Sequence, residues 1–269
     1  MTSLIVGIRF HEGGKTYHFD ASGFSDLEIG DFVVVETTRG KQLGQIVVFV
    51  DPEGAKGDQN WKSIIRKATP RDLVLRQILE DKEAQALGFA QSLIQDTSLQ
   101  GVKFVSAEFS LDGENLIFLY AYEGKKDPEL QGILSDLRDR YPEKHLELRR
   151  IGPRDAAKII GGMGACGKGI RCCTEYMTEF TPISIKMAKE QGVSLAPSEI
   201  TGMCGRLRCC LMYEHEQYVA AKKDLPERGK RVRTPRGEGK VVRLNPLRQE
   251  VLVDLGESGV QRFDEQDIE

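Results

Sequence analysis

The sequence predicts an α+β protein built from four parts in chain order. An N-terminal antiparallel β region covers residues 1–60, a ferredoxin-like βαββαβ domain 61–152, a cysteine-rich metal-binding region 153–225, and a small basic β-barrel of the SH3 or KOW kind 226–269. Three observations lead to this division. Short apolar runs separated by turn residues occupy both ends, strands and helices alternate in the centre, and all six cysteines of the 269 residues lie between positions 166 and 210.

The N-terminal part is predicted to form a small antiparallel sheet. Its apolar runs are separated by Gly13-Gly14, Gly30 and Arg39-Gly40, which favour turns. The predicted strands cover 4–10, 15–20, 31–36 and 42–49. The polar stretch 51–60 is rich in turn residues and is expected only to connect this sheet to the centre.

The centre alternates strands with helices. A short strand at 61–67 precedes a long helix that begins at Pro70 and keeps one apolar face as far as about residue 99. Strands at 102–109 and 116–122 flank Asp112-Gly113, a pair typical of hairpin turns. A second helix runs from Pro128 to Pro142, and a strand at 145–151 follows. This β-α-β-β-α-β order predicts the ferredoxin-like arrangement.

The last part follows a short helix at 214–223 and is predicted to hold strands at 230–233, 239–244, 250–255 and 259–263. Residues 222–248 carry ten Lys or Arg against three acids, a net charge of about +7, which suits an RNA phosphate backbone. Arg231 and Arg233 are the candidate contacts in this segment. A solvated surface balanced by acidic patches elsewhere is the alternative, because no aromatic residue interleaves with these charges to stack on bases.

Composition limits the chemistry of the cysteines. The formal net charge of −3 predicts no global attraction to nucleic acid, so any such contact must be local. No basic segment followed by an apolar run begins the chain, and no stretch approaches the length of a membrane span, which predicts a cytoplasmic protein without direct membrane insertion. Thiols stay reduced in that compartment, so metal binding or redox chemistry is favoured over three structural disulfides.

The cysteines fall into two similar half-sites. The same pattern occurs from Gly164 to Tyr176 and again from Gly202 to Tyr213. It consists of Gly-x-Cys-Gly, a short spacer, Arg-Cys-Cys, and a tyrosine three residues after the cysteine pair. The second spacer has one residue fewer. Cys166, Cys172 and Cys173 belong to the first half-site, and Cys204, Cys209 and Cys210 to the second. This duplication predicts two similar loops that each offer three sulfurs, with glycines supplying backbone freedom.

Thiolates bind soft and borderline metals, chiefly zinc and the iron of iron–sulfur clusters. Zinc ribbons favour Cys-x-x-Cys knuckles, which this chain lacks. Adjacent cysteines in extended chain point in opposite directions, so one of each pair is expected to face the site and the other a second ion or the core. Six sulfurs fill one four-ligand cluster with two left over, or supply three to each of two clusters and require donors from a partner or a second copy. Zinc and free buried thiols remain alternatives.

Four cations, Lys168, Arg171, Arg206 and Arg208, lie within the half-sites. Their charges lower the pKa of nearby thiols and offset the negative charge of a thiolate-bound cluster, and they are equally candidates for contact with phosphate or with a partner. His215 follows Cys210 closely enough to complete a site, although a structural role is the commoner use of a histidine. The chain contains no phosphate-binding Gly-x-x-x-x-Gly-Lys-Ser/Thr loop, His-Glu-x-x-His helix or Gly-x-Ser-x-Gly elbow, and no enzyme is predicted.

Four segments carry a resemblance to a known family: ETTRGKQLGQIV (36–47), IGPRDAAKIIGGMGACGKGIRCC (151–173), FTPISIKMAKEQGVSLAPSEITGMCGRLRCCLMYE (180–214) and YVAAKKDLPERGKRVRTPRGEGKVVRLNPL (218–247). They closely resemble the bacterial YaaT/RicT proteins, a stage 0 sporulation family whose shared domain is named for a polymerase suppressor. The resemblance covers nearly the whole chain. In the first half-site, Ala165 stands where the family pattern has proline and Lys168 where it has arginine, and one extra residue precedes the cysteine pair.

The resemblance implies a non-enzymatic regulatory adaptor. Such an adaptor binds [4Fe–4S] clusters through these cysteines, forms a complex with two small helical proteins of the YlbF/YmcA type, and adjusts mRNA processing by ribonuclease Y, with effects on sporulation, competence and biofilm formation. It also implies that Cys166, Cys172, Cys173, Cys204, Cys209 and Cys210 are cluster ligands or lie beside them. The alternative is a zinc-stabilised module that binds RNA directly through the basic C-terminal barrel.

Overall fold

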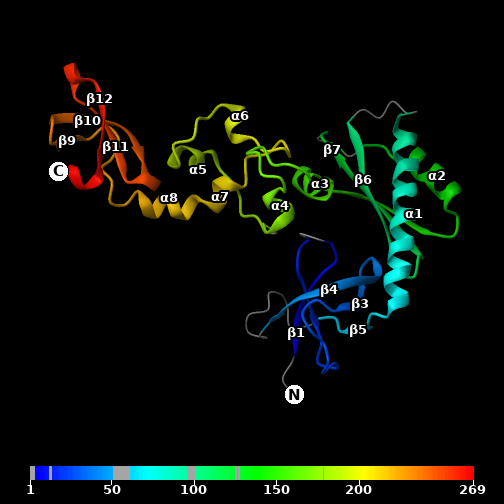
Figure 1. The fold of residues 1–269 in the computed structure, drawn as a ribbon. Helices are drawn as coiled ribbons and strands as arrows, with labels where there is room; N and C mark the ends of the chain where they lie inside the picture. The colour runs from blue at the N-terminus through cyan, green and yellow to red at the C-terminus, as the bar shows by residue number, and fades with distance from the viewer. Residues whose placement is uncertain are drawn as a thin grey trace. The chain divides into compact units, whose positions relative to one another are not determined.

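The computed structural model describes residues 4–11, 14–50, 61–95, 101–124, 126, 128–177 and 179–269. The chain forms two compact units, residues 1–179 and 180–269. The first unit holds two β-sheets and the long helix α1, and the second holds short helices followed by a β-sheet (Figure 1). The predicted α+β class is confirmed.

A five-stranded antiparallel sheet begins the first unit. Its strands are β1 (Ile5–Arg9), β2 (Tyr17–Asp20), β3 (Phe32–Thr37), β4 (Gly40–Val50) and β5 (Ile64–Lys67), in the order β2-β1-β4-β3-β5. Side chains alternate across β3, where Val33 and Val35 join a core with Ile8, Phe19 and Ile46. Val34 between them packs into the core of the next sheet instead. The N-terminal β region is therefore as predicted, and β3 is buried on both faces.

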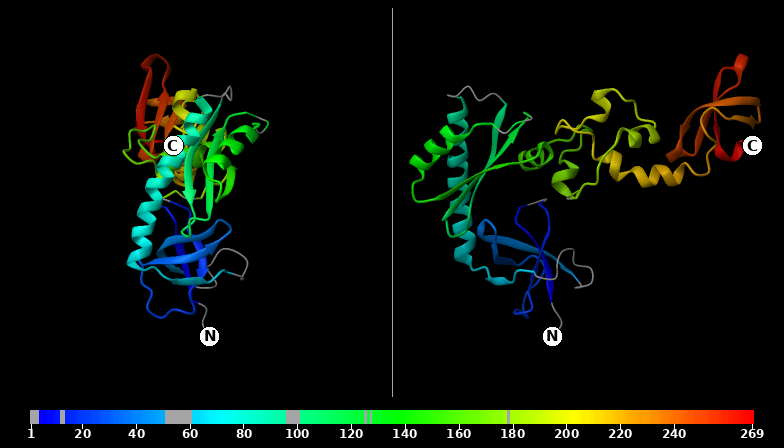
Figure 2. Two further views of the ribbon diagram at one scale, coloured as in Figure 1. Left: turned by 90° about the vertical axis from the view of Figure 1, so that its right-hand side faces the viewer. Right: turned by 180° about the vertical axis from the view of Figure 1, so that it is seen from behind.

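The second sheet has three strands and is covered by helices. Its elements are α1 (Pro70–Gln95), β6 (Val102–Phe109), β7 (Asn115–Tyr122), α2 (Gln131–Arg140) and β8 (His145–Arg150), with β6 and β7 antiparallel and β7 and β8 parallel. Helices α1 and α2 lie on one face (Figures 1 and 2). Phe104 and Phe118 are fully buried beneath them with Leu79 and Leu137. The predicted hairpin turn is present, with Gly113 at φ +70°.

The predicted ferredoxin-like sheet is not formed. That arrangement requires the strand before α1 to join the strands that follow it, but β5 pairs antiparallel with β3 of the first sheet. Two features explain the difference. Only Ile64 of β5 is buried, and it packs in the first sheet's core. In the second sheet, β8 pairs parallel with β7 after the α2 crossover, and Leu146 and Leu148 pack against that sheet's core.

The N-terminus of α1 is tied to β5 by a buried carboxylate. Asp72 accepts hydrogen bonds from the backbone N–H and hydroxyl of Thr69 at 2.8 and 2.6 Å, which caps the helix. Both terminal nitrogens of Arg66 donate to the same carboxylate, at 2.6 and 2.8 Å. The Arg66 guanidinium holds the pKa of the Asp72 carboxyl far below its ordinary value. The helix start is thereby fixed to the first sheet.

Helix α3 (Pro153–Ile160) lies against the other face of the three-stranded sheet (Figures 1 and 2). It contacts β6 and β7 through a face that buries Ala156 and Ala157. Ile117 and Leu119, which alternate with the core residues of β7, are buried as well. The first half-site begins directly after this helix and is thus anchored to the sheet.

The second unit begins with short helices. These are α5 (Ile185–Glu190), α6 (Pro197–Ile200), α7 (Cys210–Tyr213) and α8 (His215–Ala221). Ala188, Ile200 and Leu211 form a small core, and Leu207 packs against it. Gln191 donates a buried hydrogen bond to the carbonyl of Leu211. This core carries the second half-site.

A four-stranded antiparallel sheet follows. Its strands are β9 (Arg231–Thr234), β10 (Gly237–Asn245), β11 (Glu250–Asp254) and β12 (Val260–Asp264), in the order β12-β11-β10-β9, with short 3₁₀ turns at 246–248, 256–258 and 265–267. Val232, Val241, Val251 and Val253 fill its core. The backbones of Arg233 and Glu269 exchange two hydrogen bonds, at 2.9 and 3.0 Å, so residue 269 lies beside β9. The SH3 or KOW barrel stays a prediction.

No helix in the described part of the chain is both long and apolar enough to cross a membrane. The longest, α1, carries charged residues along its length.

Candidate metal centre

The two half-sites fold into loops with the same backbone hydrogen bonds. In the first, the N–H of Gly164 donates to the carbonyl of Lys168 at 2.8 Å, and the N–H of Gly167 donates to that of Gly164 at 3.0 Å. In the second, Gly202 donates to Arg206 at 2.8 Å and Gly205 donates to Gly202 at 2.9 Å. The duplication seen in the sequence is therefore a duplication of conformation.

Each loop turns on one left-handed glycine. Gly167 has φ +85° and Gly205, its equivalent, has φ +74°. Residues with a Cβ rarely adopt this conformation. Each glycine directly follows the single cysteine of its half-site, Cys166 or Cys204. The glycine requirement in the motif thus follows from the turn that presents that cysteine.

The arginine before each cysteine pair braces its loop. Arg171 Nε donates to the carbonyl of Met163 at 3.1 Å, and Arg171 Nη1 donates to that of Ala157 in α3 at 2.5 Å. Arg208 Nε donates to the carbonyl of Thr201 at 3.2 Å, and Arg208 Nη2 donates to that of Ser198 in α6 at 2.7 Å. Met163 and Thr201 occupy equivalent positions, directly before the first glycine of each loop.

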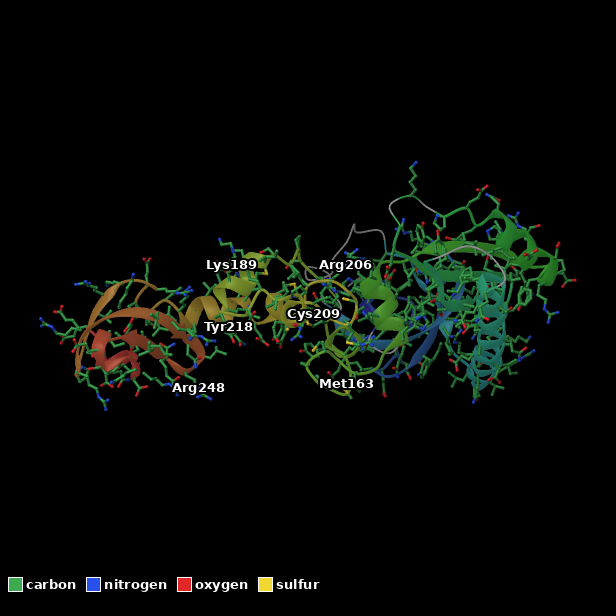
Figure 3. The ribbon with its side chains drawn as sticks, turned by 90° about the horizontal axis from the view of Figure 1, so that it is seen from above. Met163, Lys189, Arg206, Cys209, Tyr218 and Arg248 are labelled. Carbon is green, nitrogen blue, oxygen red and sulfur yellow. The ribbon has the colours of Figure 1, made fainter. Side chains whose placement is uncertain are left out.

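The six thiols are all free but differ in exposure. Cys166 is exposed and Cys172 is half-buried, whereas Cys173 is buried with 7% of its surface exposed. In the second unit Cys204, Cys209 and Cys210 are all half-buried. Cys172 begins the short helix α4 (Cys172–Glu175) and Cys210 begins α7. Cys209 directly precedes α7 (Figure 3).

The cations of the half-sites have different partners. Lys168 forms an ion pair with Glu175, and its Nζ lies 5.0 Å from the centre of the Tyr176 ring. The pair with Glu175 raises the pKa of Lys168, and the nearby thiols Cys172 and Cys166 contribute in the same direction. Arg206, at the equivalent position of the second loop, is exposed, and no ion-pair partner for it occurs in the ranges described.

Burial raises the pKa of the Cys210 thiol, and the charge of Glu214 adds to this increase while Arg208 opposes it. His215, the histidine considered as a completing ligand, has its Nδ1 3.4 Å from a carboxylate oxygen of Glu190. This histidine therefore contacts a carboxylate of α5.

The thiols have the donor chemistry that a thiolate-bound metal requires. Three belong to each unit, and no cluster of three or more Cys, His, Asp and Glu side chains arranged to hold a metal ion occurs among the residues that the structure covers. Six reduced cysteines on two matched loops fit an iron–sulfur cluster or zinc in ligand type. Cys173, which faces the interior, is the least accessible member of the set.

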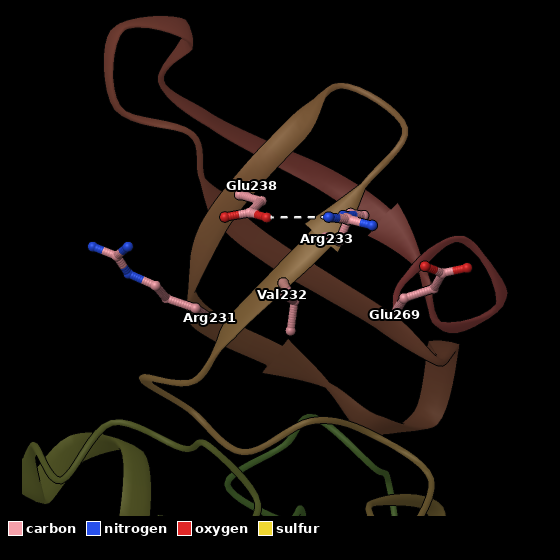
Figure 4. Close-up of a pocket in the computed structure, with 5 residues that line it drawn as sticks. All are labelled: Arg231, Val232, Arg233, Glu238 and Glu269. Carbon is pink, nitrogen blue, oxygen red and sulfur yellow. Dashed lines mark ion pairs between the residues drawn. The ribbon is translucent and has the colours of Figure 1, made fainter.

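Arg231 and Arg233, the candidate RNA contacts, are exposed on β9 and line a shallow pocket of about 320 Å³ with Val232, Glu238 and Glu269 (Figure 4). Arg233 Nη2 lies 3.6 Å from a carboxylate oxygen of Glu238. Two carboxylates in this pocket reduce its positive charge.

Two family models match the chain. The PSP1 C-terminal conserved region matches residues 62–151, and the third domain of PSP1-like proteins matches residues 182–225. Stage 0 sporulation protein YaaT of Bacillus subtilis (strain 168) is 38% identical over 256 residues, which cover 93% of this chain and 90% of that protein. The chain belongs to the YaaT/PSP1 family. No solved structure gives a significant match.

The family regions correspond to distinct parts of the structure. The PSP1 C-terminal region covers β5 through β8, and the third domain covers α5 through α8 with the whole second loop. The first loop lies between them. The alignment with YaaT covers 93% of this chain and therefore spans both loops, and the family predicted from the motifs is confirmed.

Proposed function

We propose that this chain is a non-enzymatic, cytoplasmic regulatory adaptor that binds [4Fe–4S] clusters through its two cysteine loops. It assembles with small helical proteins of the YlbF/YmcA type and modulates mRNA processing by ribonuclease Y, as part of the control of sporulation, competence and biofilm formation. Membership of the family of a stage 0 sporulation protein supports the regulatory role.

One observation carries the cluster-binding part. Two loops of the same backbone conformation, one in each unit, each present thiols next to a left-handed glycine and a braced arginine. Such a cluster would supply a redox-sensitive and oxygen-sensitive group to the adaptor. The accessible thiols Cys166, Cys172, Cys204, Cys209 and Cys210 are the residues to hold it. Because each loop has at most three thiols, a four-ligand cluster needs a further donor from outside that loop.

The experiment is anaerobic purification of the full chain, with assays for iron, acid-labile sulfide and zinc. We expect a brown protein with a broad visible absorption band, and Cys204→Ser or Cys209→Ser should remove most of the iron assigned to the second loop. Met203→Ala is the matched control, because Met203 is an exposed neighbour without a thiol. A colourless protein with stoichiometric zinc would contradict the cluster.

The adaptor part is tested by co-purification. The wild-type chain should retain the small helical proteins and change the cleavage pattern of transcripts processed by ribonuclease Y in cells. The cysteine variants should lose that effect while Met203→Ala keeps it. An unchanged cleavage pattern in a deletion strain would exclude the regulatory role.

A second candidate is a zinc-stabilised protein that binds RNA directly through the C-terminal sheet. The exposed arginines of β9 favour it, with Lys240 opposite Arg231 on β10. In this case RNA affinity should persist without partners, fall steeply with salt, and weaken when Arg231→Ala and Arg233→Ala are combined. Arg236→Ala is the single-charge control, because Arg236 lies in the turn between β9 and β10 and bonds to Gln261.

A further inference from the structure

The arginine directly before each cysteine pair, Arg171 or Arg208, donates side-chain hydrogen bonds to two backbone carbonyls of its own unit. The guanidinium of Arg208 reaches Thr201 and Ser198, and that of Arg171 reaches Met163 and Ala157. Each therefore connects three segments: the residue directly before the loop, the preceding helix, and the start of the cysteine pair. Both arginine residues are half-buried.

We propose that Arg171 and Arg208 are positioning residues, which hold the two cysteine loops in a ligand-presenting shape before any metal is bound. The effect of these arginines on cluster binding rests on the function proposed above, whereas their effect on the conformation of the loops does not. This role differs from the phosphate contact or charge compensation that a cation beside thiols suggests. In this role, the hydrogen bonds that the guanidinium donates to backbone carbonyls are the reason that the motif has arginine at this position.

Arginine chemistry fits this role. A guanidinium is planar and carries its donors in a fixed fork, so one side chain satisfies two carbonyls at a fixed separation. Lysine carries the same charge on a single flexible nitrogen and cannot reproduce that geometry. The backbone N–H of Arg208 also donates to the carbonyl of Ile200 at 2.8 Å, which adds a third attachment. Because Cys209 is the next residue, fixing Arg208 fixes where the cysteine pair begins.

Arg206 and Arg208 of the second loop can be compared directly. Arg206 lies two residues before Arg208 and has the same charge, yet it is exposed, and the described residues include no ion-pair partner for it. A role based on charge predicts similar effects when either arginine is neutralised. A role based on backbone contacts predicts an effect for Arg208 alone.

The test uses the full chain, reduced and metal-free, as wild type, Arg208→Gln, Arg208→Lys and Arg206→Gln. The readout is amide hydrogen exchange at Gly202 and Gly205, whose N–H groups make the loop's own hydrogen bonds. Arg208→Gln and Arg208→Lys should speed exchange at these amides about tenfold, since each loses the paired contacts. Arg206→Gln should leave it unchanged. The thermal unfolding midpoint reports whether each variant is folded.

Iron and sulfide content after anaerobic reconstitution then links the loop to the cluster. We expect Arg208→Lys to bind about fivefold less than wild type and to show an altered visible spectrum, although it keeps the charge. Arg171→Gln, read at Gly164 and Gly167 in the other unit, provides a second measurement if Arg208 variants unfold. Failure of the wild type to bind iron would reject the proposed function, while amide exchange would still decide the loop role.

Two results would overturn the proposal. One is unchanged exchange at Gly202 and Gly205 in a folded Arg208→Gln variant. The other is equal loss of iron in Arg206→Gln and Arg208→Gln together with full recovery in Arg208→Lys, which would show that the arginine acts through its charge.

Discussion

The two cysteine loops share one backbone conformation but are held by different physical means. The first loop follows α3, which packs on the three-stranded sheet, and polar contacts attach it to that helix. Thr174 after its cysteine pair donates a hydrogen bond to the carbonyl of Lys158 at 3.2 Å. At the equivalent position the second loop has Leu211, which is buried in a small apolar core with Ala188 and Ile200.

This difference shows which properties belong to the motif and which to its surroundings. The turn at Gly167 or Gly205 and the arginine brace occur in both loops, although the anchors around the two loops differ. Exposure of the second cysteine of the pair differs, since Cys173 is buried and its equivalent Cys210 is half-buried. The motif therefore sets the loop shape, and the packing around it sets which thiols reach the surface.

The largest effect is expected from truncating the apolar anchor of the second loop. Leu211→Ala removes a side chain that is 3% exposed and leaves a cavity, which should destabilise the helices of the second unit by about 2–4 kcal/mol. Thr174→Ala, its counterpart in the first loop, loses one part-buried hydrogen bond and should cost only about 1 kcal/mol. Hydrogen exchange of the peptide 183–214 measures the destabilisation by Leu211→Ala, and that of the peptide 153–177 measures the destabilisation by Thr174→Ala. Equal losses would mean that the two loops are anchored alike.

A smaller effect, equal in both loops, is expected at the left-handed glycines. Gly167→Ala and Gly205→Ala should each destabilise their loop by about 1–2 kcal/mol, because a Cβ disfavours positive φ while nothing lies within 4 Å of it. Gly169→Ala is the control in the first loop, as Gly169 has the same open space without positive φ. Amide exchange at Gly164 and Gly202 is the measurement. A clear effect in one loop alone would contradict their shared conformation.

Much of the structure compared above could be predicted from the sequence, because the strands and the loops are specified by residues close together in the chain. Alternating apolar residues predicted the strands of both end sheets, and the repeated glycines and cysteines predicted two similar loops. The pairing of β5 could not be predicted, since four residues with one buried side chain, Ile64, hold little information about a distant partner. The family was predicted correctly from four segments.

The hydrogen-bond partners of the side chains in the site could not be predicted from the sequence. Arg171 and Arg208 were predicted to face thiols, phosphate or a partner, and their inward contacts depend on where α3 and α6 end. The repeated arginine at one position of both half-sites was the available signal. Cys173 is buried in α4, which contacts α3, and no spacing in the motif encodes that contact.

A modest pH effect is expected at the Cys210 thiol. Burial and the charge of Glu214 raise its pKa, so less of it is thiolate at neutral pH. Glu214→Gln removes the second cause, lowers the pKa and should speed alkylation of Cys210 at pH 7.5 about two- to threefold. The measurement is the pH profile of iodoacetamide labelling in reduced, metal-free protein, read by mass spectrometry. Glu216→Gln on the exposed side of α8 is the control, and an equal increase there would exclude a specific effect of Glu214.

The smallest effect is expected at the cation after each left-handed glycine. Lys168 pairs with Glu175 and lies over Tyr176, whereas Arg206 is exposed with no ion-pair partner in the described ranges. Lys168→Ala should therefore lower the thermal midpoint of the first unit by about 1 °C at low salt, because exposed ion pairs are weak. The difference should vanish near 1 M salt, where screening acts over about 3 Å. Arg206→Ala should change nothing at either salt concentration, so a matching decrease there would show that the loops share this contact too.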